Sequence, residues 1–198
     1  MKLPKLIGLS GRAGVGKNLA ADLLAPMGYE VHSFAAPIYA AISAMTHIPV
    51  QKLADREFKE QPIEGLGFSP RQLMQTLGTE WARNTRRDDF WVRRADMKWN
   101  LVKQQGMAGM IMSDVRFDNE ARWIIDNDGI VLNITRLGVE SVAAHSSENG
   151  INPKYITHHI HNDGTIDELR SELVLAVTHV NWIIYSQVPM GNVTAGFG

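Results

Sequence analysis

Residues 6–25 read LIGLSGRAGVGKNLAADLLA: a short apolar run, a glycine-rich turn, and then leucine and alanine at helical spacing. Gly11, Gly16 and Lys17 match the phosphate-loop pattern G-x-x-x-x-G-K-[ST] at every position except the last, where Asn18 stands in place of serine or threonine. In such a loop, backbone N–H groups and the start of the next helix surround phosphate oxygens, and the lysine reaches the β- and γ-phosphates. The strand pattern before the loop and the helical pattern after it favour a nucleotide-phosphate site over a simple glycine-rich turn.

The identity of residue 18 bears on metal binding. The amide oxygen of Asn18 can touch Mg²⁺ or accept a hydrogen bond from a metal-bound water, but it carries no charge, so a carboxylate elsewhere should matter more. Asp114 is the candidate, because it follows an apolar run at residues 109–113 (GMIMS) and would end a buried strand beside the loop. The alternative is a turn or helix-capping aspartate. Arg116 can clamp a phosphate with two hydrogen bonds, unless it forms a surface salt bridge.

The composition is that of an ordinary folded protein. The chain has 198 residues, 44% hydrophobic and 21% charged, with a net charge of −1 and no cysteine. This length suits one domain, or one core with an insertion. The near-neutral charge gives no general attraction to nucleic acid or an anionic membrane, and the lack of cysteine excludes disulfides. No window approaches the roughly 20 apolar residues of a membrane span. We therefore expect a soluble, cytoplasmic protein that does not bind nucleic acid directly.

Apolar runs alternate with helical patterns, which predicts an α/β fold with a mostly parallel five-stranded sheet and helices on both faces. The strands are expected at residues 6–10, 30–34, 109–113, 129–135 and 154–160. Residues 36–105 are predicted to form a helical insertion after the second strand, and residues 137–153 a loop. We expect a single domain over residues 1–185 and a flexible tail over residues 186–198.

Residues 69–83 (SPRQLMQTLGTEWAR) predict a helix with Ser69 as its N-cap and Pro70 as its first residue. One stripe at a spacing of four is apolar and is predicted to be core: Leu73, Leu77 and Trp81. A second stripe offers a guanidinium, an amide and a position without a side chain: Arg71, Gln75 and Gly78. These groups can seat a phosphate and a base edge, unless they form a solvated helix face. Glycine inside a helix costs about 1 kcal/mol relative to alanine, so Gly78 indicates a close approach or a break.

Residues 83–96 (RNTRRDDFWVRRAD) contain five arginines and three aspartates. The mixed signs favour an exposed, ion-paired surface, with the alternative that one arginine faces the site: Arg83, Arg86 or Arg87. The aromatic residues at helical spacing are predicted to belong to the core: Phe90, Trp91 and Trp99.

Taken in order, these motifs resemble the bacteriophage deoxynucleoside monophosphate kinases, within the P-loop nucleotide-kinase superfamily. The similarity covers most of residues 5–178 and depends on SGRAGVGKN with the following ADLL, SFAAP, SPRQLMQTLGTEWAR, SDVRFDNEA, HSSENG and IHNDGTIDEL. It implies a three-layer P-loop kinase fold that transfers the γ-phosphoryl group of ATP to the 5′-phosphate of a deoxynucleoside monophosphate, with Mg²⁺ between the donor phosphates. The product would supply precursors for phage DNA synthesis in the host cytoplasm.

The resemblance also implies roles for the positions that match the family's motifs. ATP would contact the loop and the NDGT turn: Gly11, Ala13, Gly14, Val15, Gly16, Lys17, Asn18, Leu19, Asn162 and Gly164. The acceptor would be bound through the insertion and the SDVRF motif, by Arg71, Gln75 and Arg116. Catalysis would fall to Lys17 and Arg116, together with Asp114. The residue pattern itself, rather than the resemblance, marks Asp114 and Asn18 as the candidate Mg²⁺ ligands. Arg136 would belong to a lid formed with residues 137–153.

Two segments depart from the usual family pattern. Asp and Thr often follow the loop lysine, where this chain has Asn18 and Leu19, and this bears on metal ligation. The SFA-P segment often continues to a lysine, where this chain has Tyr39, so one acceptor or phosphate contact is left unfilled. Two other functions stay open: a P-loop kinase for another small acceptor, such as dephospho-coenzyme A or a sugar acid, and a non-catalytic nucleotide-binding protein. A homodimer is also left open.

Overall fold

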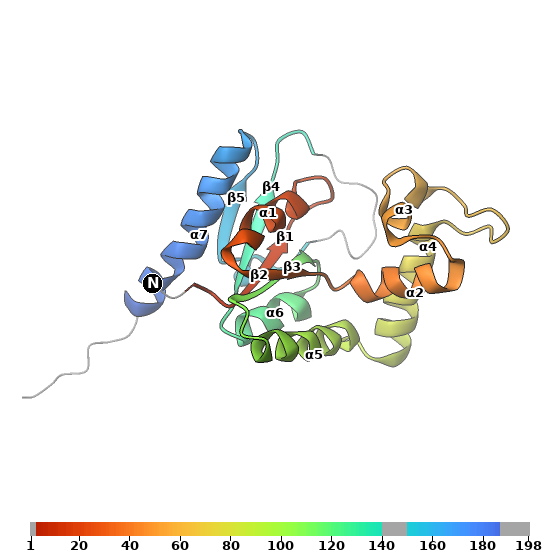
Figure 1. Cartoon of the computed structure of the whole chain (residues 1–198), viewed down its shortest axis with the longest axis horizontal. Coiled ribbons are helices and arrows are strands. Elements are labelled where there is room, and N and C mark those ends of the chain that lie inside the picture. Colours follow the sequence, from red (N-terminus) through yellow and green to blue (C-terminus); the bar gives the residue numbers. More distant parts are fainter. Residues whose placement is uncertain (1–2, 140–149, 187–198) are drawn as a thin grey trace, which may run out of the picture.

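The computed structural model (Figure 1) describes residues 3–139 and 150–186. Its centre is a five-stranded sheet made of β1 (Leu6–Ser10), β2 (Tyr29–His32), β3 (Gly109–Val115), β4 (Ile130–Thr135) and β5 (His158–His161). The strand order is β2-β3-β1-β4-β5, and every neighbouring pair is parallel. The predicted α/β fold is therefore confirmed.

The last strand is shorter than predicted. It was expected to begin at residue 154, but Pro153–Tyr155 form a single 3₁₀ turn, η5, and β5 begins only at His158. Asn152 caps this turn by accepting a hydrogen bond from the Lys154 N–H at 3.1 Å, and the proline ring suits the first position of such a turn.

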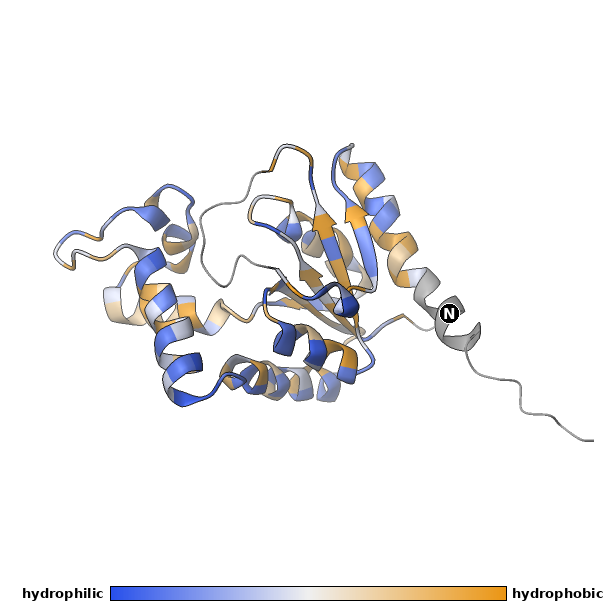
Figure 2. Cartoon of the chain, turned by 180° about the vertical axis from the view of Figure 1, so that it is seen from behind, coloured by the Kyte–Doolittle hydropathy of each residue, from blue (hydrophilic) through white to orange (hydrophobic). Residues whose placement is uncertain are grey.

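Helices cover both faces of the sheet. One face carries α1 (Lys17–Leu24) and α7 (Ile166–Ser186), and the other carries α5 (Phe90–Gln104) and α6 (Asp118–Asp126) (Figure 1). Successive residues of a strand point to opposite faces, so Leu6 of β1 joins the core beneath α5 and α6, while Ile7 joins the core beneath α1 and α7. Strands buried on both faces are nearly continuous apolar runs, and Figure 2 shows the strands as largely hydrophobic.

The segment between β2 and β3 is helical, as predicted, and most of it extends beyond the sheet (Figure 1). Its elements before α5 are α2 (Ala36–Thr46), α3 (Val50–Ala54), η2 (Phe58–Glu60), α4 (Pro70–Gln75) and η3 (Thr76–Arg86). Helix α5 instead lies along the sheet, where Trp91 and Trp99 are buried in one core with Met110 and Met112 of β3. The core role predicted for these two tryptophans is confirmed, and Phe90 packs against the same core while remaining partly exposed.

Helix α4 begins as predicted but does not continue as an α-helix. Ser69 Oγ accepts from the Gln72 N–H at 3.2 Å, and Gln72 Oε1 accepts from the Ser69 N–H at 2.8 Å, a complete capping box. From Thr76 the chain forms a π-helix, which has wider turns than an α-helix. Its last turn closes with the Arg87 N–H donating to the Ala82 carbonyl at 3.0 Å.

The wider turn explains two errors in the predicted stripes. Trp81 was predicted to be core, yet it is 40% exposed, because α-helical spacing no longer holds after Thr76. Gly78 was placed beside Arg71 and Gln75, but it is buried. A Cβ at Gly78 would lie 2.9 Å from Ile38 Cδ1, and its carbonyl accepts from Trp91 Nε1 at 2.8 Å. The close approach inferred from Gly78 is thus present, on the core side of the helix.

Parts of the predicted lid and tail cannot be compared with the structure. Residues 140–149, within the predicted lid-like loop, and residues 187–198 of the predicted tail lie outside the described residues. Within residues 3–139 and 150–186, no helix is both long enough and apolar enough to span a membrane.

Candidate active site

The phosphate loop connects the end of β1 to α1, and its glycines are required by both conformation and space. Gly11 and Gly16 have φ values of 129° and 100°, in the left-handed region that favours glycine. A Cβ at Gly11 would lie 2.2 Å from the Ile134 carbonyl oxygen, and one at Gly16 would lie 2.3 Å from Asn162 Nδ2. The loop is thus packed tightly against β4 and the end of β5.

Asn162 supports the loop from behind. It is buried, its Nδ2 donates to the Val15 carbonyl at 2.8 Å, and its own N–H donates to the Thr135 carbonyl at 2.9 Å. One residue thereby ties the loop to β4. Gly164 makes room for the capping carboxylate of α7, since a Cβ there would lie 2.2 Å from Glu168 Oε2. Neither residue lines the two cavities described below, so their predicted position beside the adenine stays a prediction.

Lys17 is the first residue of α1 and bends back over the loop. Its Nζ donates to the Gly11 and Arg12 carbonyls, each at 2.7 Å. These bonds hold the ammonium at the opening of the loop, beside the backbone that would surround a phosphate.

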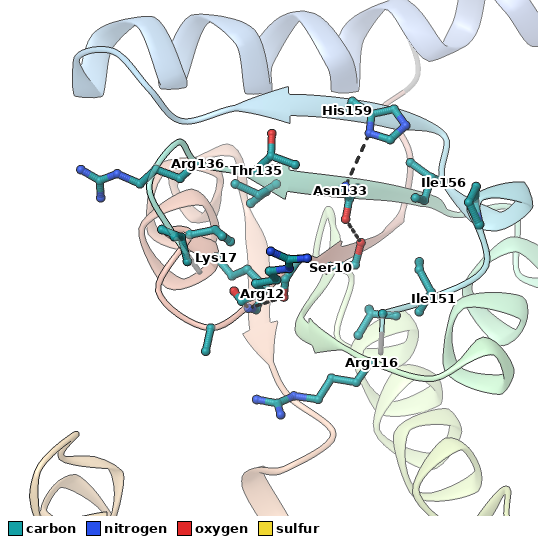
Figure 3. A pocket seen from close by; sticks show the side chains of 18 residues that line it. Ser10, Arg12, Lys17, Arg116, Asn133, Thr135, Arg136, Ile151, Ile156 and His159 are labelled. Atoms are coloured by element: carbon teal, nitrogen blue, oxygen red, sulfur yellow. Dashed lines mark hydrogen bonds between the residues drawn. The ribbon is translucent and has the colours of Figure 1, made fainter. Parts of the chain in front are cut away.

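A cavity of about 440 Å³, here called the β4–β5 cavity, lies on one side of the loop (Figure 3). Ser10, Asn133 and His159 occupy neighbouring register positions on three adjacent strands. Ser10 Oγ donates to Asn133 Oδ1 at 3.1 Å, and Asn133 Nδ2 lies 3.5 Å from His159 Nδ1. Arg12 and Arg136 add positive charge to the lining of this polar cavity.

A second cavity of about 630 Å³, here called the insertion cavity, lies between the loop, the end of β3 and the helical insertion. It brings together six residues that the sequence indicated from separate segments: Lys17, Asn18, Arg71, Gln75, Asp114 and Arg116. Thr79 lines it in place of Gly78, as the π-helix requires. Two residues of the predicted second stripe, Arg71 and Gln75, therefore face a cavity, and Thr79 takes the place of Gly78.

Two residues, Lys17 and Arg116, line both cavities. Lys17 follows the loop after β1, and Arg116 follows β3, the strand that pairs with β1. In Figure 3 the Arg116 side chain extends away from Asn133 and His159. Positive charge from two neighbouring strand ends is thus placed where the cavities meet.

Asp114 lines the insertion cavity, but its carboxylate also has a structural task. Oδ1 accepts from the Phe34 N–H at 2.7 Å and Oδ2 accepts from the Ala35 N–H at 3.0 Å, so it fixes the turn that leads into α2. Burial raises the pKa of Asp114, whereas the two amide hydrogen bonds and the charges of Arg116 and Lys17 lower it. Asp114 therefore has the turn role that the sequence left open as an alternative, and it also faces the insertion cavity.

The side chains also permit a magnesium site. The Asn18 amide and the Asp114 carboxylate line the same cavity as Lys17. Uncharged and carboxylate oxygens are the ligands that Mg²⁺ prefers, and it usually takes few of them from protein. The two groups are chemically compatible with Mg²⁺, and their role as its ligands stays a prediction.

Glu120 is a site residue whose importance the sequence did not reveal. It is 2% exposed and pairs with Arg83, which is 9% exposed, while its Oε2 accepts from the Arg116 and Phe117 N–H groups at 2.8 and 3.2 Å. Burial raises the pKa of Glu120 to about 7, with Arg83 opposing the shift. Glu120 therefore fixes the backbone that carries Arg116. A glutamate three residues after a helix start is a capping signal that could have drawn attention to it.

The three arginines of residues 83–87 do not line either cavity. The Arg83 guanidinium lies 3.9 Å from the Phe117 ring centroid, besides pairing with Glu120. Arg87 pairs with Asp89 at 2.5 Å, in keeping with the ion-paired surface that was favoured.

A model of the family described as deoxynucleotide monophosphate kinase matches residues 63–173, more than half of the chain. The chain belongs to the deoxynucleotide monophosphate kinase family. As a member of this kinase family it is a phosphotransferase that uses nucleotides. The matched residues contain Arg71, Asp114, Arg116 and Glu120, and the phosphate loop precedes them.

Two viral relatives carry the name of the deoxynucleotide monophosphate kinase family. One, from Acanthamoeba polyphaga mimivirus, is 29% identical over 194 residues, which cover 89% of this chain and 97% of the relative. The deoxynucleoside-5′-monophosphate kinase of Escherichia phage T5 is 31% identical over 133 residues, 59% of this chain and 49% of that enzyme. The solved structure of TT1252 from Thermus thermophilus aligns with a TM-score of 0.51 at 20% identity, over 90% of this chain and 98% of the other, which supports the fold alone.

Proposed function

We propose that this protein transfers the γ-phosphoryl group of ATP to the 5′-phosphate of a deoxynucleoside monophosphate, giving ADP and a deoxynucleoside diphosphate. Membership of the family supports the reaction class. The observation that carries the proposal is that Lys17 and Arg116 line both the cavity beside the loop and the cavity beneath the insertion. A transferase for two phosphorylated substrates needs cationic groups at one junction between two binding spaces.

The donor phosphates would bind in the loop. The N–H groups of the loop and of the first turn of α1, within residues 11–19, would surround the phosphate oxygens, and the Lys17 ammonium would contact the β- and γ-phosphates. Arg136, which follows β4 and lines the β4–β5 cavity, would approach the donor from the lid side. Asn162 would act indirectly by keeping Val15 in place.

The acceptor would bind in the insertion cavity. Arg71 and Gln75 lie on the same face of α4 and line this cavity, which Arg116, the residue after β3, also lines. A guanidinium can hold a phosphate with two parallel hydrogen bonds, and an amide can both donate to and accept from a base edge. Arg71 would therefore hold the acceptor phosphate and Gln75 would read the base.

The chemical problem is mutual repulsion rather than nucleophile activation. An oxygen of the acceptor phosphate attacks the γ-phosphorus as the bond to the bridging oxygen breaks, and ADP leaves. The acceptor oxygen is already anionic, so Lys17 and Arg116 act by neutralising the charge of the two phosphate groups as they approach. Mg²⁺, when bound through Asn18 and Asp114, would neutralise further charge on the donor phosphates.

A coupled assay of ADP release across all deoxynucleoside and ribonucleoside monophosphates tests the proposal. Turnover with at least one deoxynucleoside monophosphate, dependent on Mg²⁺, is the expected result. Dephospho-coenzyme A and gluconate belong in the same panel, because they represent the other small acceptors that P-loop kinases phosphorylate. Turnover confined to one of those two would reassign the acceptor. No turnover with any of these acceptors would contradict the proposal.

A further inference from the structure

Lys59 and Tyr39 contact each other on the wall of the insertion cavity, apart from the residues proposed above to bind the acceptor. Lys59 Nζ donates to the Tyr39 hydroxyl at 2.6 Å and lies 5.2 Å from the centroid of the Tyr39 ring. Both side chains are partly buried and both line the insertion cavity, whereas neither lines the β4–β5 cavity. The contact therefore faces only the side on which the acceptor would bind.

The turn that carries Lys59 is well fixed. Element η2 consists of Phe58–Glu60, and Asp55 Oδ1 accepts from the Glu57 and Phe58 N–H groups at 3.1 and 2.9 Å. The Lys59 N–H donates to the Asp55 carbonyl at 3.0 Å. Tyr39 lies in the first turn of α2, directly after the segment that Asp114 holds. Two ordered elements thus bring the ammonium and the hydroxyl together.

The charges on this wall give the contact its significance. Arg71 pairs with Glu60 at 2.5 Å, so the cation predicted to hold the acceptor phosphate already shares its charge with a carboxylate. Glu60 directly follows Lys59 in η2, which places Lys59 beside this pair. An approaching phosphate dianion would meet a guanidinium and a carboxylate of opposite charge. The ammonium of Lys59, in contact with a hydroxyl, supplies the positive charge that this pair lacks.

We propose that Lys59, oriented by Tyr39, is a second contact for the acceptor phosphate and sets acceptor affinity together with Arg71. This inference depends on the proposed function, because it assumes a monophosphate in the insertion cavity. Tyr39 is a positioning residue, since its hydroxyl restricts where the flexible lysine side chain can lie. The ligand class is a phosphate monoester dianion, and the contact should have no effect on the affinity for ATP.

The test compares Lys59→Met, Lys59→Arg and Tyr39→Phe with Lys52→Met as the matched control. Lys52 lies on neighbouring α3, with its ammonium 4.7 Å from the Phe58 ring centroid, and it lines neither cavity. Steady-state rates are measured with the deoxynucleoside monophosphate that the wild type uses best and with ATP, and calorimetry measures binding of that monophosphate in the absence of ATP. Thermal unfolding identifies any variant that is not folded.

We expect Lys59→Met to raise the KM and the dissociation constant for the monophosphate by about tenfold or more, as for a lost hydrogen bond to a charged group, with the KM for ATP unchanged. Lys59→Arg should recover most of the affinity. Tyr39→Phe should have a smaller effect alone and none when added to Lys59→Met. The inference would be overturned if Lys59→Met and Lys52→Met gave the same KM for the monophosphate, or if Lys59→Met raised the KM values for the monophosphate and for ATP equally. Neither result would overturn the proposed function. A wild type that neither binds nor phosphorylates any monophosphate would overturn the proposed function and this inference with it.

Discussion

Lys17 and Arg116 border both cavities, although one lies at the start of α1 and the other at the end of β3. This relationship follows from the topology, because β1 and β3 are adjacent parallel strands whose carboxyl ends meet at one edge of the sheet. Ligands in open α/β sheets bind at this edge. The junction is where charge would develop during phosphoryl transfer, and the first prediction concerns it.

Arg116→Ala should lower kcat by about 10³ or more, the effect of a well-placed arginine in phosphoryl transfer. Arg71→Ala should mainly raise the KM for the acceptor, and Asn18→Ala should be the mildest of the three changes. Arg122→Ala is the control, because Arg122 is exposed on α6 and pairs with Asp126 at 3.4 Å, outside both cavities. Steady-state kinetics measure all four variants. The ranking is wrong if Asn18→Ala is the most damaging.

Asn162→Ala should weaken ATP binding, because Asn162 holds the phosphate loop in place. Loss of the bond to the Val15 carbonyl leaves a buried acceptor unpaired, which costs about 1–3 kcal/mol of folding free energy. It should also loosen the loop. We expect a higher KM for ATP, an unchanged KM for the acceptor and a lower melting temperature. Asn127→Ala removes a similar bond, from Asn127 Nδ2 to the Trp123 carbonyl at 2.9 Å, and should leave both KM values unchanged. Equal KM values for ATP in the two variants would contradict the supporting role.

Glu120 predicts a pH dependence of stability. Its pKa is raised from 4.5 to about 7 in the folded protein, so between these values the folded state keeps a proton that the unfolded chain has released. The stabilisation from this proton is fully present below pH 4.5 and is lost as the pH rises to about 7. The free energy of unfolding of the wild type, minus that of Glu120→Gln, should therefore fall over this interval by up to about 3 kcal/mol and then level off.

Denaturant titrations at several pH values measure this difference. Glu80→Gln, at an exposed position on η3, is the matched control for removal of a carboxylate. A constant difference between the wild type and Glu120→Gln would show that Glu120 does not titrate in this interval.

Asp114→Asn should separate the two tasks of the Asp114 side chain. In the amide an NH2 group replaces one of the two carboxylate oxygens, so either the Phe34 or the Ala35 N–H would face a donor instead of its acceptor, and the melting temperature should fall. If Asp114 also holds magnesium, the Mg²⁺ concentration for half-maximal activity should rise, and Asn18→Ala should raise it without loss of stability. A lower melting temperature with unchanged Mg²⁺ dependence would leave Asp114 only its turn role.

The fold and much of the site could be predicted from the sequence because their signals are local. The phosphate loop, the capping box at Ser69 and the apolar strand before Asp114 each depend on residues close together in the chain. Parallel strands then bring their carboxyl ends together, which is why residues from three segments line one cavity. The error at Trp81 arose because Gly78 indicated a close approach or a break without specifying that the chain changes to a π-helix at Thr76.

The remaining site residues depend on contacts between distant segments. Glu120 joins Arg83 of η3 to the backbone of Arg116, and no local spacing predicts that pairing. From the sequence, Tyr39 leaves a phosphate contact unfilled, because the family often has a lysine at this position. The sequence does not show whether a lysine from another segment lies nearby. The fold brings Lys59 to it from a different turn.

The bond between Asn162 and Val15 also bears on how the protein is made. The glycine-rich segment leaves the ribosome well before the side chain that braces it, because Asn162 is synthesised only after all five strands. A nascent polypeptide would therefore carry the nucleotide-binding motif long before it could hold a nucleotide firmly. Ligand affinity should appear late in translation, when the fifth strand has joined the sheet.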